Sequence, residues 1–139
     1  MPGKAFIDTN IVIYALGPIS SRTRAASLLF VDNPVISTQV LSETANIANK
    51  KFKMSLPDIR RLITTLESIC QVEIIFPPTI TAALDLMEQY RFSWFDSLIL
   101  ATALQAGCHT LYTEDLQHNQ TIHGQLKIIN PLRHREEIT

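Results

Sequence analysis

The chain has 139 residues, of which 46% are apolar, so it is long enough and apolar enough to bury the core of one domain. Thirteen acidic residues against twelve basic ones give a formal net charge of −1, so the total charge indicates neither a nucleic-acid partner nor an anionic membrane. The composition argues against a disordered tail and against a multidomain enzyme.

The two cysteines, Cys70 and Cys108, stand far apart, with neither a CxxC motif nor the Cys/His spacing of a zinc site. This usage fits a reducing compartment, and we expect a cytoplasmic protein. The first apolar run is short and is interrupted by Asp8, which is not typical of a signal peptide. The longest apolar stretch, residues 94–106, is shorter than the roughly 20 residues that a membrane span needs, so we expect no membrane partner.

Strand and helix patterns alternate along the chain. Short β-rich runs predict strands over residues 4–8, 35–37, 72–76, 108–113 and 126–129. Helical spacing and capping signals predict helices over residues 11–16, from Ser20 or Ser21 to about 31, 38–53, 55–69, 79–90 and 95–106. Because parallel strands need crossover connections, the order predicts an α/β fold, a three-layer α/β/α sandwich around a parallel sheet of about four or five strands. We expect a single domain over residues 1–132 and a polar tail over residues 133–139.

Four carboxylates occupy positions where an apolar residue or a strand end is expected. Asp8 and Asp115 follow the first and fourth predicted strands, Asp96 begins the most apolar helix, and Glu43 lies between Val40 and Ile47 at helical spacing. The other nine acids fall in turns, first turns of helices, solvated faces or the tail. Burial of a charge is costly unless a partner or a metal compensates it, so these four acids are candidates for a site.

Each of the four has a structural explanation to be weighed against the functional one. Asp8 could cap the next helix, Asp96 could cap its helix or stabilise the first turn after Ser93, and Asp115 could initiate a turn. Glu43 has the weakest such explanation, because a mid-helix acid gains nothing from a helix end. All four, however, lie near strand ends or helix starts that a doubly wound sheet brings to one edge.

Four carboxylates at one edge would raise one another's pKa unless a cation were bound. Ligation by oxygen alone favours Mg²⁺ or Mn²⁺ over zinc. Such a metal lowers the pKa of bound water and offsets the charge of a phosphodiester, so no nucleophilic side chain is required. The sequence accordingly has no GxSxG, GxxxxGK[ST] or GxGxxG motif.

Four segments in order resemble the PIN-domain nucleases, and in particular the VapC-like toxins of toxin–antitoxin modules. They are residues 6–14 (FIDTNIVIY), 39–43 (QVLSE), 93–99 (SWFDSLI) and 111–118 (LYTEDLQH), and the resemblance spans nearly the whole chain.

The resemblance implies an acidic metal pocket of Asp8, Glu43, Asp96 and Asp115, supported by Thr9, Asn10 and Thr113. It implies a metal-dependent endoribonuclease that hydrolyses RNA through a metal-activated water, with Mg²⁺ or Mn²⁺ as cofactor. It also implies a cognate antitoxin and a homodimer. The sequence departs from the family where many relatives have a further acid and an aromatic residue, at Leu116 and Gln117, and where close relatives often have glycine, at Asn119. These departures concern a second metal position and the substrate-side loop.

An acidic pocket repels a polyanion, so basic residues must guide the RNA. The candidates lie at the end of the Glu43 helix and on the next helix: Lys50, Lys51, Lys53, Arg60 and Arg61. Their alternative role is to complement a helix dipole in solvent.

Three other functions compete with a nuclease toxin. A haloacid-dehalogenase-like phosphatase also begins with a strand and an aspartate, but its second aspartate and its Gly-Thr are replaced here by Asn10 and Ile11. A PIN-domain nuclease of RNA processing or decay would have the same acids. A non-catalytic interaction module with this fold would not need all four.

Overall fold

Six short strands form one sheet at the centre of the fold. The computed structural model describes residues 4–133 of the chain. The strands pair in the order β3-β2-β1-β4-β6-β5, and every pairing is parallel except that of β5 with β6. Their bounds are β1 (Ala5–Ile7), β2 (Val35–Ser37), β3 (Gln71–Glu73), β4 (Thr110–Tyr112), β5 (Thr121–Ile122) and β6 (Leu126–Ile129).

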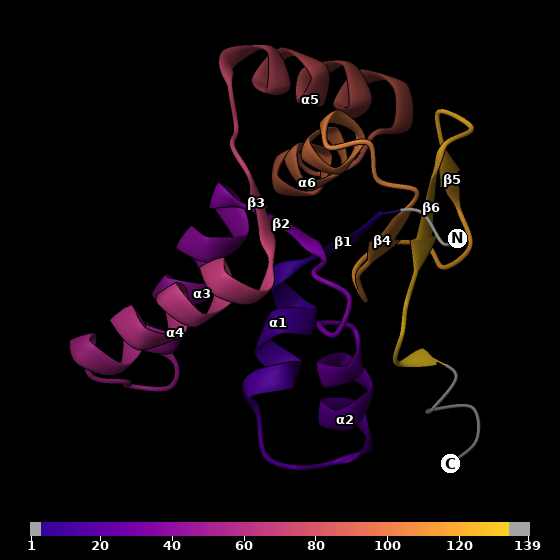
Figure 1. Cartoon of the computed structure of the whole chain (residues 1–139). Coiled ribbons are helices and arrows are strands. Elements are labelled where there is room, and N and C mark those ends of the chain that lie inside the picture. Colours follow the sequence, from indigo (N-terminus) through magenta and orange to yellow (C-terminus); the bar gives the residue numbers. More distant parts are fainter. Residues whose placement is uncertain (1–3, 134–139) are drawn as a thin grey trace.

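Six helices occupy the connections within the described range. They are α1 (Thr9–Leu16), α2 (Ser21–Leu28), α3 (Thr38–Lys50), α4 (Leu56–Ile69), α5 (Pro77–Tyr90) and α6 (Trp94–Gln105). Figure 1 shows α5 and α6 above the sheet, α1 and α2 below it, and α3 with α4 projecting to the left. The predicted α/β class with its layers of helix, sheet and helix is therefore confirmed.

The helices begin where the sequence supplies a cap. Ser37, Ser55 and Ser93 each accept a hydrogen bond from the backbone N–H three residues later, at 3.2, 3.2 and 3.3 Å. Helix α6 is the central helix, because every residue from Ser97 to Ala103 is buried. The parallel strands and α6 together enclose the core, in which Phe6, Leu100 and Leu111 are fully buried.

The structure corrects the sequence prediction at several ends. The sheet has six strands rather than four or five, because the two-residue β5 pairs antiparallel with β6 at the edge. Helix α3 ends at Lys50, not Lys53, since Lys53 adopts a left-handed backbone conformation (φ 55°). Helix α5 begins at Pro77 because proline fits the first turn, where no backbone donor is needed.

Both cysteines are buried and free, and burial raises the pKa of each thiol to about 11. No helix among residues 4–133 is both long enough and apolar enough to cross a bilayer. Most of the predicted polar tail, residues 134–139, lies outside the described residues.

Candidate active site

The carboxyl ends of β1 and β4 bring three aspartates together. Ile7 pairs with Tyr112 in the sheet, and the N–H of Asp8 donates to the Tyr112 carbonyl at 3.0 Å, so Asp8 lies beside the loop that carries Asp115. Asp96 comes from the first turn of α6. One carboxylate oxygen from each of Asp8, Asp96 and Asp115 lies within 4.8 Å of the other two. They face a hollow of about 250 Å³, here called the acidic hollow.

Asp8 is the buried member of the trio. Its Oδ1 accepts a hydrogen bond from the Thr9 N–H at 2.7 Å, which caps α1, and its Oδ2 accepts one from the Thr113 hydroxyl at 2.8 Å. Burial raises the pKa of Asp8 from 3.8 to about 6, although these two hydrogen bonds oppose the shift and the charges of Asp115 and Glu43 add to it. A carboxylate in this environment gains most from a neighbouring cation.

Thr113 connects the walls of the acidic hollow. While its hydroxyl donates to Asp8, its oxygen accepts from the Asn10 side-chain amide at 3.3 Å and from the Asp115 N–H at 3.2 Å. One buried hydroxyl thus fixes a strand end, the first turn of α1 and the loop after β4. The structure therefore places Asn10 and Thr113, both predicted as supporting residues, in contact with each other beside the aspartates.

Glu43 lines the same hollow, but its carboxylate is not part of the cluster formed by Asp8, Asp96 and Asp115. Its Oε1 accepts a hydrogen bond from the Thr9 hydroxyl at 2.8 Å, and the Gln39 amide lies at 3.5 Å from the same oxygen. The structure therefore ties Glu43 to the first turn of α1, the turn that Asp8 caps. Gln39 is not predicted as a site residue from the sequence. Its position four residues before Glu43 places both side chains on one face of the same helix, and this spacing could have indicated it.

The donor set fits a hard divalent cation. Three carboxylates converge, and two buried acceptor oxygens in the walls, Asn10 Oδ1 and Gln39 Oε1, have no hydrogen-bond partner among the described residues. Oxygen-only surroundings with unsatisfied acceptors suit Mg²⁺ or Mn²⁺ and their bound waters. The residues that would hold the ion are Asp8, Asp96 and Asp115, with Glu43 beside them.

Helix capping and acid clustering are compatible in this site. Asp8 is the N-cap of α1, and Asp96 lies in a first turn that Ser93 caps, yet the carboxylates of both also face the acidic hollow. At Asp8, where β1 leads directly into α1, one residue both caps the helix and belongs to the cluster.

The five predicted basic residues divide into two groups. Lys50, Lys53, Arg60 and Arg61 are exposed on α3, α4 and the turn between them, and Arg61 forms an ion pair with Asp58. Lys51 also lines a second hollow, which shares Asn10 and Ile47 with the acidic hollow. Among these five, Lys51 therefore lines the hollow next to the aspartates.

Comparison with known proteins identifies the family. The model of the PIN domain matches residues 5–122, whereas no curated protein matches the chain with significance. Three similar solved structures are a toxin–antitoxin complex from Klebsiella pneumoniae (TM-score 0.71, 23% identity, 92% of this chain and 98% of that one), Mycobacterium tuberculosis VapC20, a Sarcin-Ricin loop cleaving toxin (0.66, 18%, 81% and 90%), and FitAB bound to a DNA fragment (0.68, 15%, 91% and 94%). At these identities the likeness shows a shared fold. The matched model covers most of the chain, from the first strand to β5, and the chain belongs to the PIN domain family.

Proposed function

We propose that the chain is a divalent-metal-dependent endoribonuclease and the toxin of a toxin–antitoxin pair. The observation that carries the proposal is the convergence of Asp8, Asp96 and Asp115, with carboxylate oxygens within 4.8 Å, at the edge of a PIN-family sheet. Structural or interaction roles do not require three adjacent carboxylates, and their mutual repulsion costs stability when no cation is bound.

The side chains divide the work of hydrolysis between them. Asp8, held by Thr9 and Thr113, would bind the metal in a fixed position, and Asp96 and Asp115 would complete its ligands from the more open side. When bound, Mg²⁺ or Mn²⁺ would lower the pKa of a water molecule and offset the negative charge of the phosphodiester. Asp96 or Asp115 would orient the attacking water in line with the phosphorus. As the water oxygen bonds to phosphorus the P–O3′ bond would break, and the departing oxygen would take up a proton, leaving a 5′-phosphate and a 3′-hydroxyl. Glu43 keeps the Thr9 turn in place.

RNA as substrate is supported by the likeness to VapC20, a toxin that cleaves the Sarcin-Ricin loop. A protein antitoxin is supported by the Klebsiella neighbour, which is a toxin–antitoxin complex. The predicted cytoplasmic location agrees with a substrate of this kind and stays a prediction.

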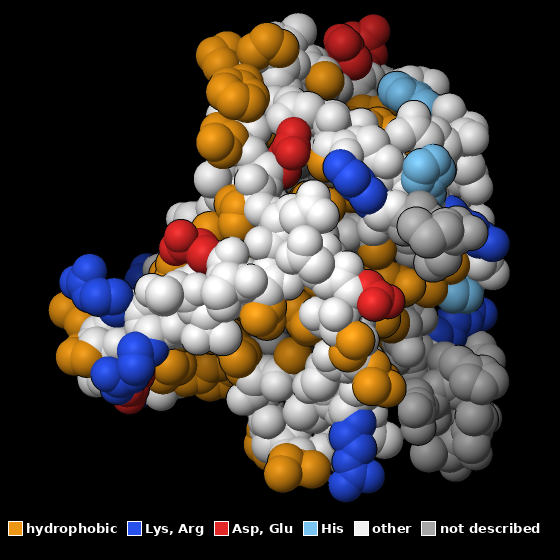
Figure 2. Space-filling model, viewed as in Figure 1, with side chains coloured by type: hydrophobic (Ala, Val, Ile, Leu, Met, Phe, Trp, Pro, Cys, Tyr) orange, Lys and Arg blue, Asp and Glu red, His pale blue; other side chains and the backbone are white. Residues whose placement is uncertain are grey.

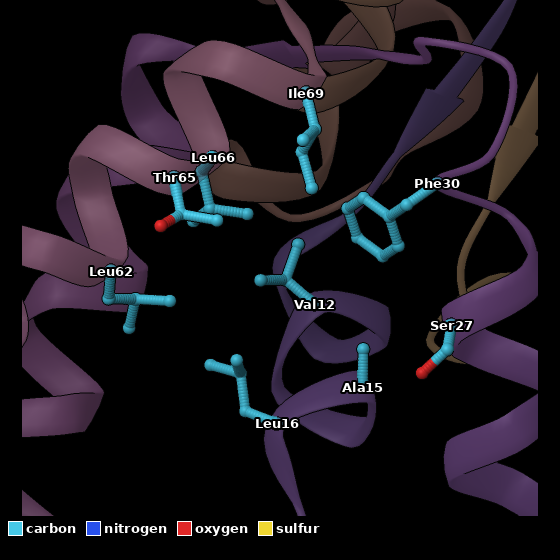
Figure 3. Close-up of a pocket in the computed structure, with 9 residues that line it drawn as sticks. All are labelled: Val12, Ala15, Leu16, Ser27, Phe30, Leu62, Thr65, Leu66 and Ile69. Carbon is cyan, nitrogen blue, oxygen red and sulfur yellow. The ribbon is translucent and has the colours of Figure 1, made fainter.

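The partner proteins would cover apolar surface. An apolar groove of about 250 Å³ lies between α1, α2 and α4, with Val12, Leu16, Phe30 and Leu62 among its walls (Figure 3). We assign this groove to the antitoxin, because a helix or strand with apolar side chains would bury it. The apolar lining of the groove supports this interface.

A second apolar area is suited to the proposed homodimer. Figure 2 shows hydrophobic side chains gathered at the upper left, where α5 begins in Figure 1. Just before α5 and within it, Ile74, Phe76 and Leu84 are each more than half exposed, which is unusual for large apolar side chains. Sedimentation equilibrium of the purified protein would test the dimer directly.

A cleavage assay tests the nuclease function. The wild-type protein with Mg²⁺ should cut a mixed RNA substrate internally, and chelation of the metal or Asp8→Asn should abolish cutting while circular dichroism shows an intact fold. Asp85→Asn, which removes an exposed acid from α5, serves as the matched control and should cut like wild type. Full activity of Asp8→Asn, or of wild type in excess chelator, would refute the proposal.

A further inference from the structure

A second hollow adjoins the acidic hollow and has a different chemistry. It measures about 610 Å³, is lined by residues of α1, α2 and α3 together with the turns that follow α1 and α3, and shares Asn10 and Ile47 with the acidic hollow. We call it the aromatic hollow. Its volume falls in the range of small-ligand sites, and its walls are apolar with a few charged groups, as such sites usually are.

Two cations in the aromatic hollow are each placed over an aromatic ring. The Arg22 guanidinium lies 5.7 Å from the centre of the Tyr14 ring and donates a hydrogen bond to the Tyr14 hydroxyl at 3.3 Å. The Lys51 ammonium lies 5.9 Å from the centre of the Phe52 ring. All four side chains line the hollow, so rings and positive charges face the same space.

This combination matches the needs of a single-stranded nucleotide. Nucleobases stack on aromatic rings whatever their sequence, and a neighbouring Arg or Lys neutralises the phosphate. The acidic hollow offers neither a ring pair nor a positive charge, so a strand whose phosphate lies at the aspartates needs its attraction from the adjacent surface. Glu114, also in the wall of the aromatic hollow, adds an acceptor for an exocyclic amino group.

We propose that the aromatic hollow binds the nucleotide next to the cleaved bond, with the base against Tyr14 or Phe52 and a phosphate at Arg22 and Lys51. The assignment rests on the proposed function, because it takes the acidic hollow as the place of the scissile phosphate. Asn10, shared by both hollows, marks the step from one nucleotide to the next.

The test measures the binding of a fluorescein-labelled 12-nucleotide RNA by anisotropy in EDTA, so that cleavage does not intervene. Tyr14→Leu keeps an apolar side chain without a π face, and we expect it to weaken binding about 5- to 100-fold, whereas Tyr14→Phe should retain most of the affinity. Arg22→Gln should also lower the slope of log affinity against log salt by about 1. Arg24→Gln, an exposed arginine on the same helix, is the matched charge control and should leave the slope unchanged.

A set of RNAs with one abasic site each adds a coupling measurement. In the wild-type protein, loss of one base should weaken binding more than loss of the others, and in Tyr14→Leu that same loss should have no further effect. Thermal unfolding of each variant shows whether it folds. If Tyr14→Leu does not fold, the salt slope of Arg22→Gln decides the question alone.

The results separate this inference from the proposed function. RNA that couples to Tyr14 but is not cut in Mg²⁺ would support the aromatic hollow as a nucleotide site and refute the nuclease. RNA that is bound and cut equally by wild type, Tyr14→Leu and Arg22→Gln would overturn the nucleotide site and leave the nuclease intact. Normal RNA binding by variants that no longer bind the antitoxin would assign the hollow to that protein and overturn the inference as well.

Discussion

At the scale of single residues, the burial of Asp8 carries an electrostatic cost. Its pKa is about 6 in the fold against an ordinary 3.8, because the carboxyl is buried. A raised pKa means that the folded state loses stability as the pH rises from about 4 to about 6, by about 3 kcal/mol at most, and that the cost persists above pH 6. A bound cation would offset this cost.

The substitution Asp8→Asn should therefore stabilise the protein when no cation is present. In urea unfolding at pH 8 with EDTA we expect the variant to exceed wild type by about 1–3 kcal/mol, and at pH 4 we expect the difference to vanish or reverse. Mn²⁺ should raise the melting temperature of wild type and not of the variant. Asp85→Asn should match wild type at both pH values. If the stability advantage of Asp8→Asn over wild type were smaller at pH 8 than at pH 4, the burial cost assigned to Asp8 would be contradicted.

Thr113 offers a second test at the residue scale. Thr113→Val keeps the shape but removes the hydroxyl that donates to Asp8 and accepts from Asn10 and Asp115. We expect the pH midpoint of Mn²⁺ binding to move to higher pH, since the variant lacks the hydrogen bond that lowers the pKa of Asp8. Thr102→Val, which removes another buried hydroxyl bonded to the Leu98 carbonyl, should leave the midpoint in place. An equal shift of the pH midpoint in both variants would contradict a specific role of the Thr113 hydroxyl in setting the pKa of Asp8.

Residue types and local spacing alone led to the acids, because each follows a strand or interrupts an apolar helix face. The partners could not be predicted in the same way. The Thr9 to Glu43 bond spans 34 positions and the Thr113 to Asp8 bond spans 105, so both depend on how the strands pair. The contact of Arg22 with Tyr14 crosses the turn after α1, and no helical spacing indicates it.

At the scale of elements, helix caps place the acids as well as stabilise the helices. Ser93→Ala removes the cap of α6 and should cost about 1 kcal/mol of stability. Since Asp96 lies three residues later, we also expect weaker Mn²⁺ binding by calorimetry. Ser55→Ala removes the equivalent cap of α4 and should cost a similar stability with no change in Mn²⁺ affinity. Equal Mn²⁺ affinity in both variants would contradict a role of the Ser93 cap in positioning Asp96.

Long elements with strong caps were predicted more accurately than short ones. The start of α4 follows from Ser55 and Pro57, and the buried run of α6 follows from its apolar sequence. Strand β5 was not predicted because it has only two residues and because its turn places His123 at positive φ, which is uncommon for a residue other than glycine. Local sequence thus predicts an element well where capping and burial agree.

At the scale of the whole molecule, a net charge of −1 conceals a separation of charge. Three aspartates meet in the acidic hollow, while Arg22 and Lys51 line the aromatic hollow beside it and further lysines follow at the end of α3. Replacement of Lys50, Lys51 and Lys53 together by Gln should flatten the salt dependence of RNA binding, by a slope of about 1 for each phosphate that is no longer neutralised. An unchanged slope in filter-binding titrations would remove these lysines from the RNA path.

The proposed cleavage depends on the binding of a divalent cation by the three aspartates. The most direct measurement is the anomalous difference density of a crystal soaked in Mn²⁺. We predict a peak between the carboxylates of Asp8, Asp96 and Asp115, and its absence from Asp8→Asn crystals grown and soaked identically. A peak elsewhere on the molecule, or none at this position at millimolar Mn²⁺, would contradict the proposed metal site.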